Sequence, residues 1–330
     1  MGQTIFILYR TLTPSAVDSQ EGTSIAPRKP RGQLVLFLRD AGVALLFVVF
    51  ILLAMFAYSG LWPPLVVVES NSMMHGDDNT SHIGAIDTGD LVLVKKVDHP
   101  SDIATYADGL STGHKTYGDY GDVVIYKKGG SDTLTPIIHR ALIYLEPNAD
   151  GLSYRSASLR DAPKSAWSTY PANDTWDHLT GALVLMNVSY NHVSVQIDIG
   201  NMIRYFEAQG IDPKPGLITK GDHNQQTDQT SWGPGPVVDF KWIVGKARGE
   251  IPWFGLLKLW STHSIASPAP DNSVRDLWIA LALIIISPIA VDIILSIREK
   301  RLGRSKTLSP AQDEPPRLEE TPPPNPPGPS

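Results

Sequence analysis

Two long apolar runs interrupt an otherwise mixed chain. Residues 41–60 contain no charged side chain, and residues 277–297 contain one, Asp292. A helix of about 20 apolar residues matches the hydrocarbon core of a bilayer, which is about 30 Å thick. A buried core helix usually keeps a polar stripe, and the first run has none. The pattern therefore predicts two transmembrane helices.

Clusters of basic residues lie outside both apolar runs. The first cluster is Arg28, Lys29 and Arg31. The second cluster is Arg298, Lys300, Arg301, Arg304 and Lys306. Because cytoplasmic flanks carry an excess of Lys and Arg, both tails, residues 1–40 and 298–330, are expected in the cytoplasm. Residues 61–276 would then form the extracytoplasmic domain of a two-pass protein of the cell membrane. The proline-rich residues 309–330 of the second tail would be disordered.

The segment between the two runs alternates short apolar stretches with turn residues, which favours β-strands. The expected strands are residues 91–95, 122–126, 142–145, 183–188, 193–199 and 243–247. Residues 201–209 are the one expected helix of this segment. Residues 250–260 carry two tryptophans and fit either an interfacial segment or an edge of the core. We therefore expect a mainly β domain between two transmembrane helices.

The composition of the chain excludes several kinds of functional site. The chain has 330 residues, a formal net charge of −6 and no cysteine. The absence of cysteine excludes disulfides, thiolate metal sites and a cysteine nucleophile, and the charge is too modest to indicate nucleic-acid binding. His75, His82, Asp77, Asp78 and Asp87 follow no spacing typical of metal ligands. We expect no metal and no cofactor.

Three short segments carry the residue types of serine catalysis. Ser72 follows an apolar stretch, His139 ends another, and Asp222 and Asp228 belong to a third, polar segment. A serine hydroxyl needs a base to become a good nucleophile, and a histidine can be that base near neutral pH. A carboxylate on the other ring nitrogen fixes the tautomer. Sequence order alone does not choose between the two aspartates.

Four boxes together resemble the type I signal peptidases of the archaeal and endoplasmic-reticulum branch. The nucleophile box reads SNSM at residues 70–73, and a Gly-Asp-hydrophobic strand follows at residues 89–96. The base box is Ile-His-Arg at residues 138–140, with a histidine where bacterial relatives carry a lysine. The acidic box reads KGDHN at residues 220–224, and its second aspartate stands six positions after the first. The chain departs from the family pattern at Asn71, His75 and His223, and residues of about 146–215 form an insertion.

The resemblance implies a role for each matching residue. Ser72 would be the nucleophile, His139 the general base and Asp228 the orienting carboxylate. Asp222 would be a supporting acid that could exchange roles with Asp228. Ser70 and the backbone N–H of Ser72 would form the oxyanion hole. The protein would be a membrane-bound serine endopeptidase that removes N-terminal signal peptides after small residues.

The same resemblance implies signal peptides of exported preproteins and membrane lipids as partners, with the protein-translocation channel as a further candidate. The departures leave an alternative open, in which a catalytically silent envelope protein uses the same scaffold to bind or organise exported proteins.

Overall fold

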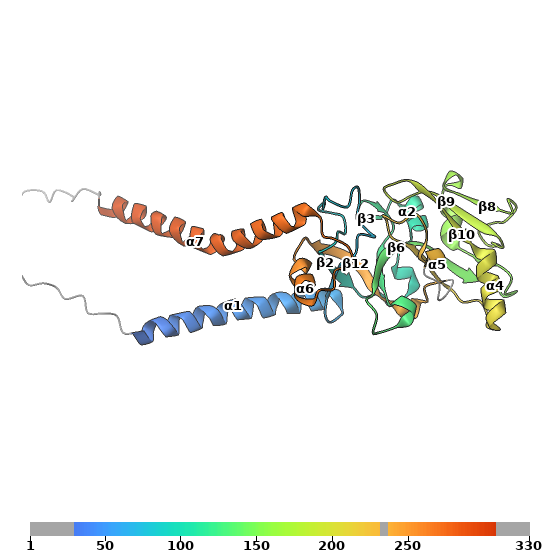
Figure 1. The fold of residues 1–330 in the computed structure, drawn as a ribbon. Coiled ribbons are helices and arrows are strands. Elements are labelled where there is room, and N and C mark those ends of the chain that lie inside the picture. The colour runs from blue at the N-terminus through green and yellow to red at the C-terminus, as the bar shows by residue number, and fades with distance from the viewer. Residues whose placement is uncertain (1–29, 232–236, 308–330) are drawn as a thin grey trace, which may run out of the picture. The chain divides into compact units, whose positions relative to one another are not determined.

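The computed structural model describes residues 30–231 and 237–307. The chain divides into two compact units, residues 1–55 and residues 56–330. The predicted disordered tail and most of the N-terminal tail lie outside the described residues. The described part of the first unit belongs to one long helix, α1 (Pro30–Ser59). The second unit holds the end of α1, the sheet domain and a second long helix, α7 (Asp271–Thr307) (Figure 1).

Both long helices contain a segment that is long and apolar enough to cross a membrane, Phe37–Ser59 and Asp271–Glu299. The apolar side chains of α7 are exposed, as Leu283 at 62% and Ile285 at 68% show. A core helix of a soluble domain would bury them. The predicted apolar segments are therefore present, and both helices run further than the apolar runs alone, because helical hydrogen bonding continues into the flanking polar residues.

The described residues form a main antiparallel sheet of seven strands. Its strand order is β1 (Leu65–Val67), β2 (Leu91–Lys95), β12 (Ile243–Ile251), β5 (Val123–Tyr126), β6 (Ile137–Pro147) and β11 (Gly216–Lys220), and β7 (Tyr154–Arg155) pairs with the end of β6. A two-stranded hairpin, β3 (Lys115–Thr116) and β4 (Asp119–Tyr120), follows α2 (Tyr106–Thr112). Short α5 (Asp228–Ser231) comes soon after β11.

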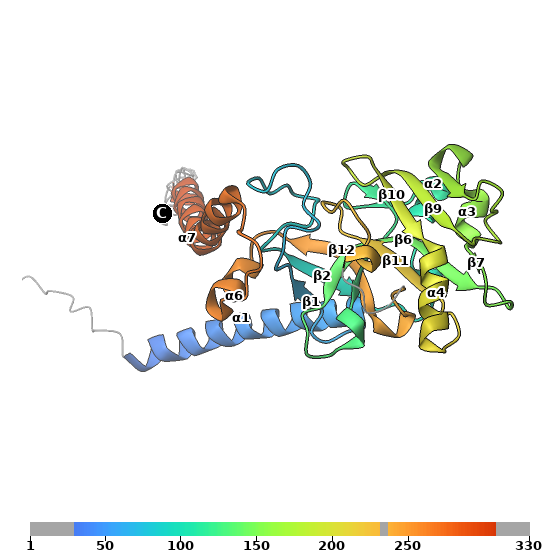
Figure 2. The same cartoon turned by 45° about the vertical axis from the view of Figure 1, so that its right-hand side comes forward.

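The segment between β6 and β11 builds a second sheet. This sheet has the order β10 (Val193–Asp198), β9 (Ala182–Val188) and β8 (Trp167–Tyr170). It is accompanied by α3 (Ala157–Asp161) and α4 (Ile199–Gln209). Leu183 of this sheet and Phe206 of α4 are buried and share one core with Leu142 of β6. In both views α4 lies at the end of the domain opposite α7 (Figures 1 and 2).

The opposite end of the domain packs on α6 (Gly255–Thr262). Leu256 and Leu259 of α6, Leu277 of α7 and Val67 of β1 form one buried cluster. The expected apolar segment 250–260 is thus divided between the end of β12 and α6. One prediction needs correction: the structure is 38% helical and 25% strand, so "mainly β" describes the sheets between the long helices but not the chain.

Candidate active site

The nucleophile box forms a turn directly after β1. The amide of Met74 donates to the carbonyl of Asn71 at 3.0 Å, which closes the turn. Met73 is 1% exposed and packs in a core cluster with Val68 and Val92, so it anchors the turn from below. Ser72 is left half-buried at the surface of the domain. Asn71 does not have a positive φ, so the turn needs no glycine at this position.

His139 lies on β6, opposite Val124 of β5, and is 1% exposed. Its Nε2 lies 2.9 Å from the hydroxyl oxygen of Ser72. Its Nδ1 lies 2.6 Å from a carboxylate oxygen of Asp228. The three side chains therefore form one hydrogen-bonded chain from a serine through an imidazole to a carboxylate. This is the geometry in which a histidine can take the serine proton while the carboxylate stabilises the imidazolium.

Asp228 is 6% exposed and begins α5. The hydroxyl groups of Tyr126 and Thr219 donate to its Oδ2 at 2.7 and 2.6 Å. Burial alone would raise the pKa of Asp228, but His139, Thr219 and Tyr126 together hold this pKa below its usual value. Burial also raises the pKa of Tyr126, as does the neighbouring carboxylate, so Tyr126 keeps the proton that it donates. Asp228 therefore stays ionised beside the imidazole.

Asp222 has different partners. Its buried carboxylate accepts from Arg140 Nε at 2.7 Å and from Arg140 Nη2 at 2.5 Å, and His75 Nε2 lies 2.9 Å away. Burial would raise the pKa of Asp222, but Arg140 and His75 hold it well below its usual value. Arg140 in turn donates through Nη1 to four backbone carbonyls between residues 116 and 121. The carboxylate that accepts a hydrogen bond from His139 is thus that of Asp228, whereas the Asp222–Arg140 pair joins residues 220–224 to the β3–β4 hairpin.

His75 and His223 meet at one tyrosine of the connection between β9 and β10. Tyr190, in the β9–β10 connection, stacks on His75 with ring centroids 4.6 Å apart. Its hydroxyl lies 3.1 Å from Nδ1 of His223. The amide of His223 donates to the carbonyl of Ser72 at 2.9 Å. The second sheet is therefore connected through this stack to the nucleophile turn.

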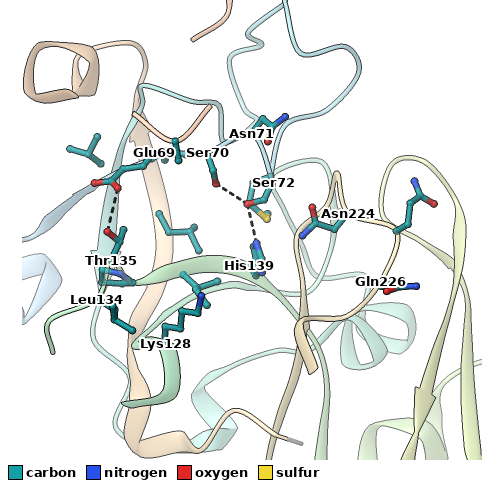
Figure 3. A pocket seen from close by; sticks show the side chains of 18 residues that line it. Glu69, Ser70, Asn71, Ser72, Lys128, Leu134, Thr135, His139, Asn224 and Gln226 are labelled. Carbon is teal, nitrogen blue, oxygen red and sulfur yellow. Dashed lines mark hydrogen bonds between the residues drawn. The ribbon is translucent and has the colours of Figure 1, made fainter. Parts of the chain in front are cut away.

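Ser70 lies beside Ser72, with the two hydroxyl oxygens 3.2 Å apart. A cavity of about 830 Å³ opens at this pair. Figure 3 shows Leu134 and Thr135 on one side of Ser72 and His139, and Asn224 and Gln226 on the other. The first side also carries Glu69 and Lys128 (Figure 3), whereas Val67, Ile137 and Ile138 add apolar surface to the cavity lining. The second side carries amide side chains.

The sequence alone assigned no role to Tyr126, Thr219, Tyr190 or Lys220. Burial lowers the pKa of Lys220 to about 8. Its ammonium donates to the hydroxyl of Ser189 at 3.0 Å and to the carbonyl of Gly221 at 2.9 Å. The sequence places Lys220 in the acidic box, but it does not predict that the side chain is buried.

Among the described residues, no group of three or more His, Cys, Asp or Glu side chains is arranged to hold a metal ion. No model of a known protein family matches this chain, and no curated protein sequence matches it.

Proposed function

We propose that this chain is a membrane-bound serine endopeptidase that removes N-terminal signal peptides from exported preproteins, as type I signal peptidases do. The observation that carries the proposal is the hydrogen-bonded chain from Ser72 through His139 to Asp228. A loop serine without a catalytic role has no reason to face a buried histidine that is itself held by a buried carboxylate. The cavity at Ser72 gives a substrate access to this chain of residues.

The position of Ser72 in the chain supports a membrane-bound substrate. Ser72 follows β1, and β1 follows a segment long enough to cross a membrane. With both basic tails in the cytoplasm, the catalytic domain lies outside the cytoplasm at the membrane surface. An exported preprotein held by its apolar signal segment then shares one bilayer with the enzyme, which raises the effective concentration of the cleavage region.

The reaction begins with attack of the Ser72 hydroxyl oxygen on the scissile carbonyl carbon. His139 Nε2 takes the serine proton as the new C–O bond forms, and Asp228 stabilises the imidazolium. The oxyanion accepts hydrogen bonds from the Ser70 hydroxyl and the Ser72 backbone N–H. One such donor typically contributes about 10²–10³ in rate.

His139 then gives its proton to the leaving amine as the C–N bond breaks, and the mature protein departs. The signal peptide stays attached to Ser72 as an ester. A water molecule, deprotonated by His139, attacks this ester, and the proton returns to Ser72 as the C–O bond breaks. The signal peptide leaves with a carboxylate, and no external oxidant, reductant or cofactor is needed.

The substrate lies in the cavity as an extended segment beside β1. The side of the cavity that carries Leu134 and Thr135 accepts the residues before the cut, which are small in signal-peptide cleavage sites.

The test is cleavage of a preprotein by the full-length protein in detergent. We expect wild type to cut after a small residue, and Ser72→Ala and His139→Ala to lose the activity. Asp77→Ala is the matched control, because Asp77 accepts a hydrogen bond from the amide of Asn79 and lies outside the Ser72–His139–Asp228 chain. Retained activity in His139→Ala would overturn the serine–histidine scheme.

A folded wild type that cuts no preprotein would instead favour the alternative function, a silent scaffold that binds exported proteins. A serine-directed covalent inhibitor gives an independent readout. We expect it to label wild type and not Ser72→Ala.

A further inference from the structure

A second cavity of about 730 Å³ adjoins the catalytic one. It lies between β10, the first turns of α4 and the segment that leads to Asp228. Gln225 and Gln226 line both cavities. The two cavities therefore border the same pair of exposed amide side chains, and an extended chain that passes over this pair would enter both.

The polarity of the lining side chains changes along the path from the first cavity to the second. In β10 the side chains alternate, so that Val195 and Ile197 are buried while Gln196 and Asp198 are exposed. Gln196, Asn201 and Tyr205 line the second cavity, and Asp198 is the charged member among the described residues that line it. The path thus runs from an end beside β1 where apolar side chains lie together with Glu69 and Lys128, called the apolar end below, to a polar end whose charge is negative.

The backbone of β10 offers hydrogen bonds along the same path. β10 pairs with β9, and in the described part of the chain no strand pairs with its other edge. An unpaired edge presents N–H and C=O groups to which an extended polypeptide can add as a further strand. The six residues of β10 offer roughly 20 Å of such an edge.

The two ends of the path face opposite ends of the domain. The apolar end borders Ala266 in the connection between α6 and α7, and the amide of Ala266 donates to the carbonyl of Glu69. The polar end borders α4, opposite α7 (Figure 2). A substrate that stays anchored by an apolar segment must enter from the α7 end, so the residues after the cut continue toward β10.

We propose that the cavity formed by β10, α4 and Gln225–Gln226 binds the mature side of the preprotein, the hydrophilic extended segment that follows the scissile bond. The site prefers neutral or basic segments, because an acidic segment would meet Asp198. The inference rests on the proposed function of Ser72 and adds to it a substrate region that the second sheet recognises.

The experiment compares two preproteins that share one signal peptide. One continues for about two mature residues, and the other for about twelve neutral polar residues, enough to reach along β10. The readout is the ratio of kcat/KM for the long substrate to that for the short one, measured with the full-length protein. We expect this ratio to be about two- to tenfold in wild type, as one or two added hydrogen bonds would give.

Gln196→Ala should move this ratio toward one. The control is Gln209→Ala, because Gln209 is also exposed but lies at the last residue of α4, outside the cavity. A third substrate with acidic residues in the long segment should be cut less well by wild type. Asp198→Asn should restore it, since asparagine can still cap α4 as Asp198 does through the amide of Asn201.

The outcomes separate the two claims. Cleavage of both substrates with a ratio of one in wild type overturns the mature-side site and leaves the peptidase proposal standing. The mature-side site is also overturned if Gln209→Ala lowers the ratio of kcat/KM values as much as Gln196→Ala does. Failure of folded wild type to cut either substrate overturns the proposed function, and the inference falls with it.

Discussion

Two buried aspartates stand six positions apart in the chain and have unlike partners. Asp228 faces a histidine and two hydroxyl groups, whereas Asp222 neutralises the guanidinium of Arg140. A carboxylate beside a histidine controls the tautomer and charge of the imidazole, so its loss affects turnover. A carboxylate that neutralises a buried guanidinium maintains the fold, because an unpaired buried charge is costly.

Replacing each aspartate should therefore give a different defect. We expect Asp228→Asn to lower kcat on a preprotein by about 10³–10⁴ while the protein stays folded. Asp222→Ala leaves Arg140 buried without its partner and should cost about 3–5 kcal/mol of stability. Turnover and the unfolding temperature in detergent, measured on both variants, distinguish the two roles. The reverse pattern would mean that Asp222 orients His139.

Asp90 makes stability depend on pH. It is 1% exposed and accepts the amides of Trp253 and Asp87 at 2.9 and 2.8 Å. Burial raises the pKa of Asp90 from 3.8 to about 7. The folded state thus binds the proton that the unfolded state releases, so this stabilisation is present below pH 4 and is lost as the pH rises to about 7.

The expected contribution is about 4 kcal/mol across this range, or some 1.4 kcal/mol for each unit of pKa shift. Asp222 and Asp228 have lowered pKa values in the folded state, so they oppose this effect only near pH 4, where the unfolded state still binds part of their protons, and not above about pH 5. The unfolding temperature of wild type and Asp90→Asn should be measured between pH 4 and 7. We expect the variant to show the smaller decrease, and equal slopes would contradict the assignment.

The sequence indicated the residues that form the serine–histidine–aspartate chain, but not the residues that hold the aspartate in place. The spacing of the boxes indicated Ser72, His139 and a pair of aspartates. The hydroxyl groups of Tyr126 and Thr219 were not predicted, because they meet at Asp228 only through strand register. β6 lies between their strands and pairs Tyr126 with Ile137 on one side and Thr219 with Ala141 on the other. No local pattern in the sequence specifies that pairing.

At the level of elements, the site depends on a close approach between the end of β11 and the nucleophile turn. A Cβ added at Gly221 would lie 2.4 Å from the carbonyl oxygen of Ser72 and 2.8 Å from Nε2 of His139. Both distances are too short for real contacts, and the first involves backbone, which yields less easily than a flexible side chain. Gly221 therefore lets three segments meet at one point.

Gly221→Ala should separate these elements and reduce turnover. A displacement of about 1 Å at a catalytic group can cost about 10²-fold in rate, so we expect a loss of that order in kcat. The control is Gly249→Ala, because an added Cβ at Gly249 of β12 meets nothing within 4 Å. Equal activity of the two variants would show that the end of β11 does not position Ser72 and His139.

Strand positions were predicted better than strand ends. The expected strand at residues 91–95 coincides with β2, whereas the expected strand at residues 142–145 is only part of β6. β6 is long because it pairs with β5, β11 and β7 along its length, and pairing extends a strand beyond its apolar centre. β7, with two residues, is too short to give any periodic signal.

For the whole molecule, the two long apolar runs determine the balance of helix and strand. α1 and α7 comprise 30 and 37 residues, which is why a chain with a β-rich domain is more helical than sheet. The sequence predicted these helices directly, since an uninterrupted apolar run is readable without tertiary context. The second sheet was predicted only in part, because its core is shared with β6 and β11, far away in sequence.

Orientation in the membrane is the remaining prediction at this scale, and it decides whether Ser72 can meet exported proteins. If the basic clusters keep both tails in the cytoplasm, the domain lies outside.

The chain has no cysteine, so a single introduced cysteine reports its own side of the membrane. Leu152 is 68% exposed in the domain, and Ser309 lies in the tail beyond α7. A membrane-impermeant thiol reagent added to intact cells should label Leu152→Cys but should label Ser309→Cys only after lysis. The opposite result would place the sheet domain in the cytoplasm, where it could not act on the exported side of a preprotein.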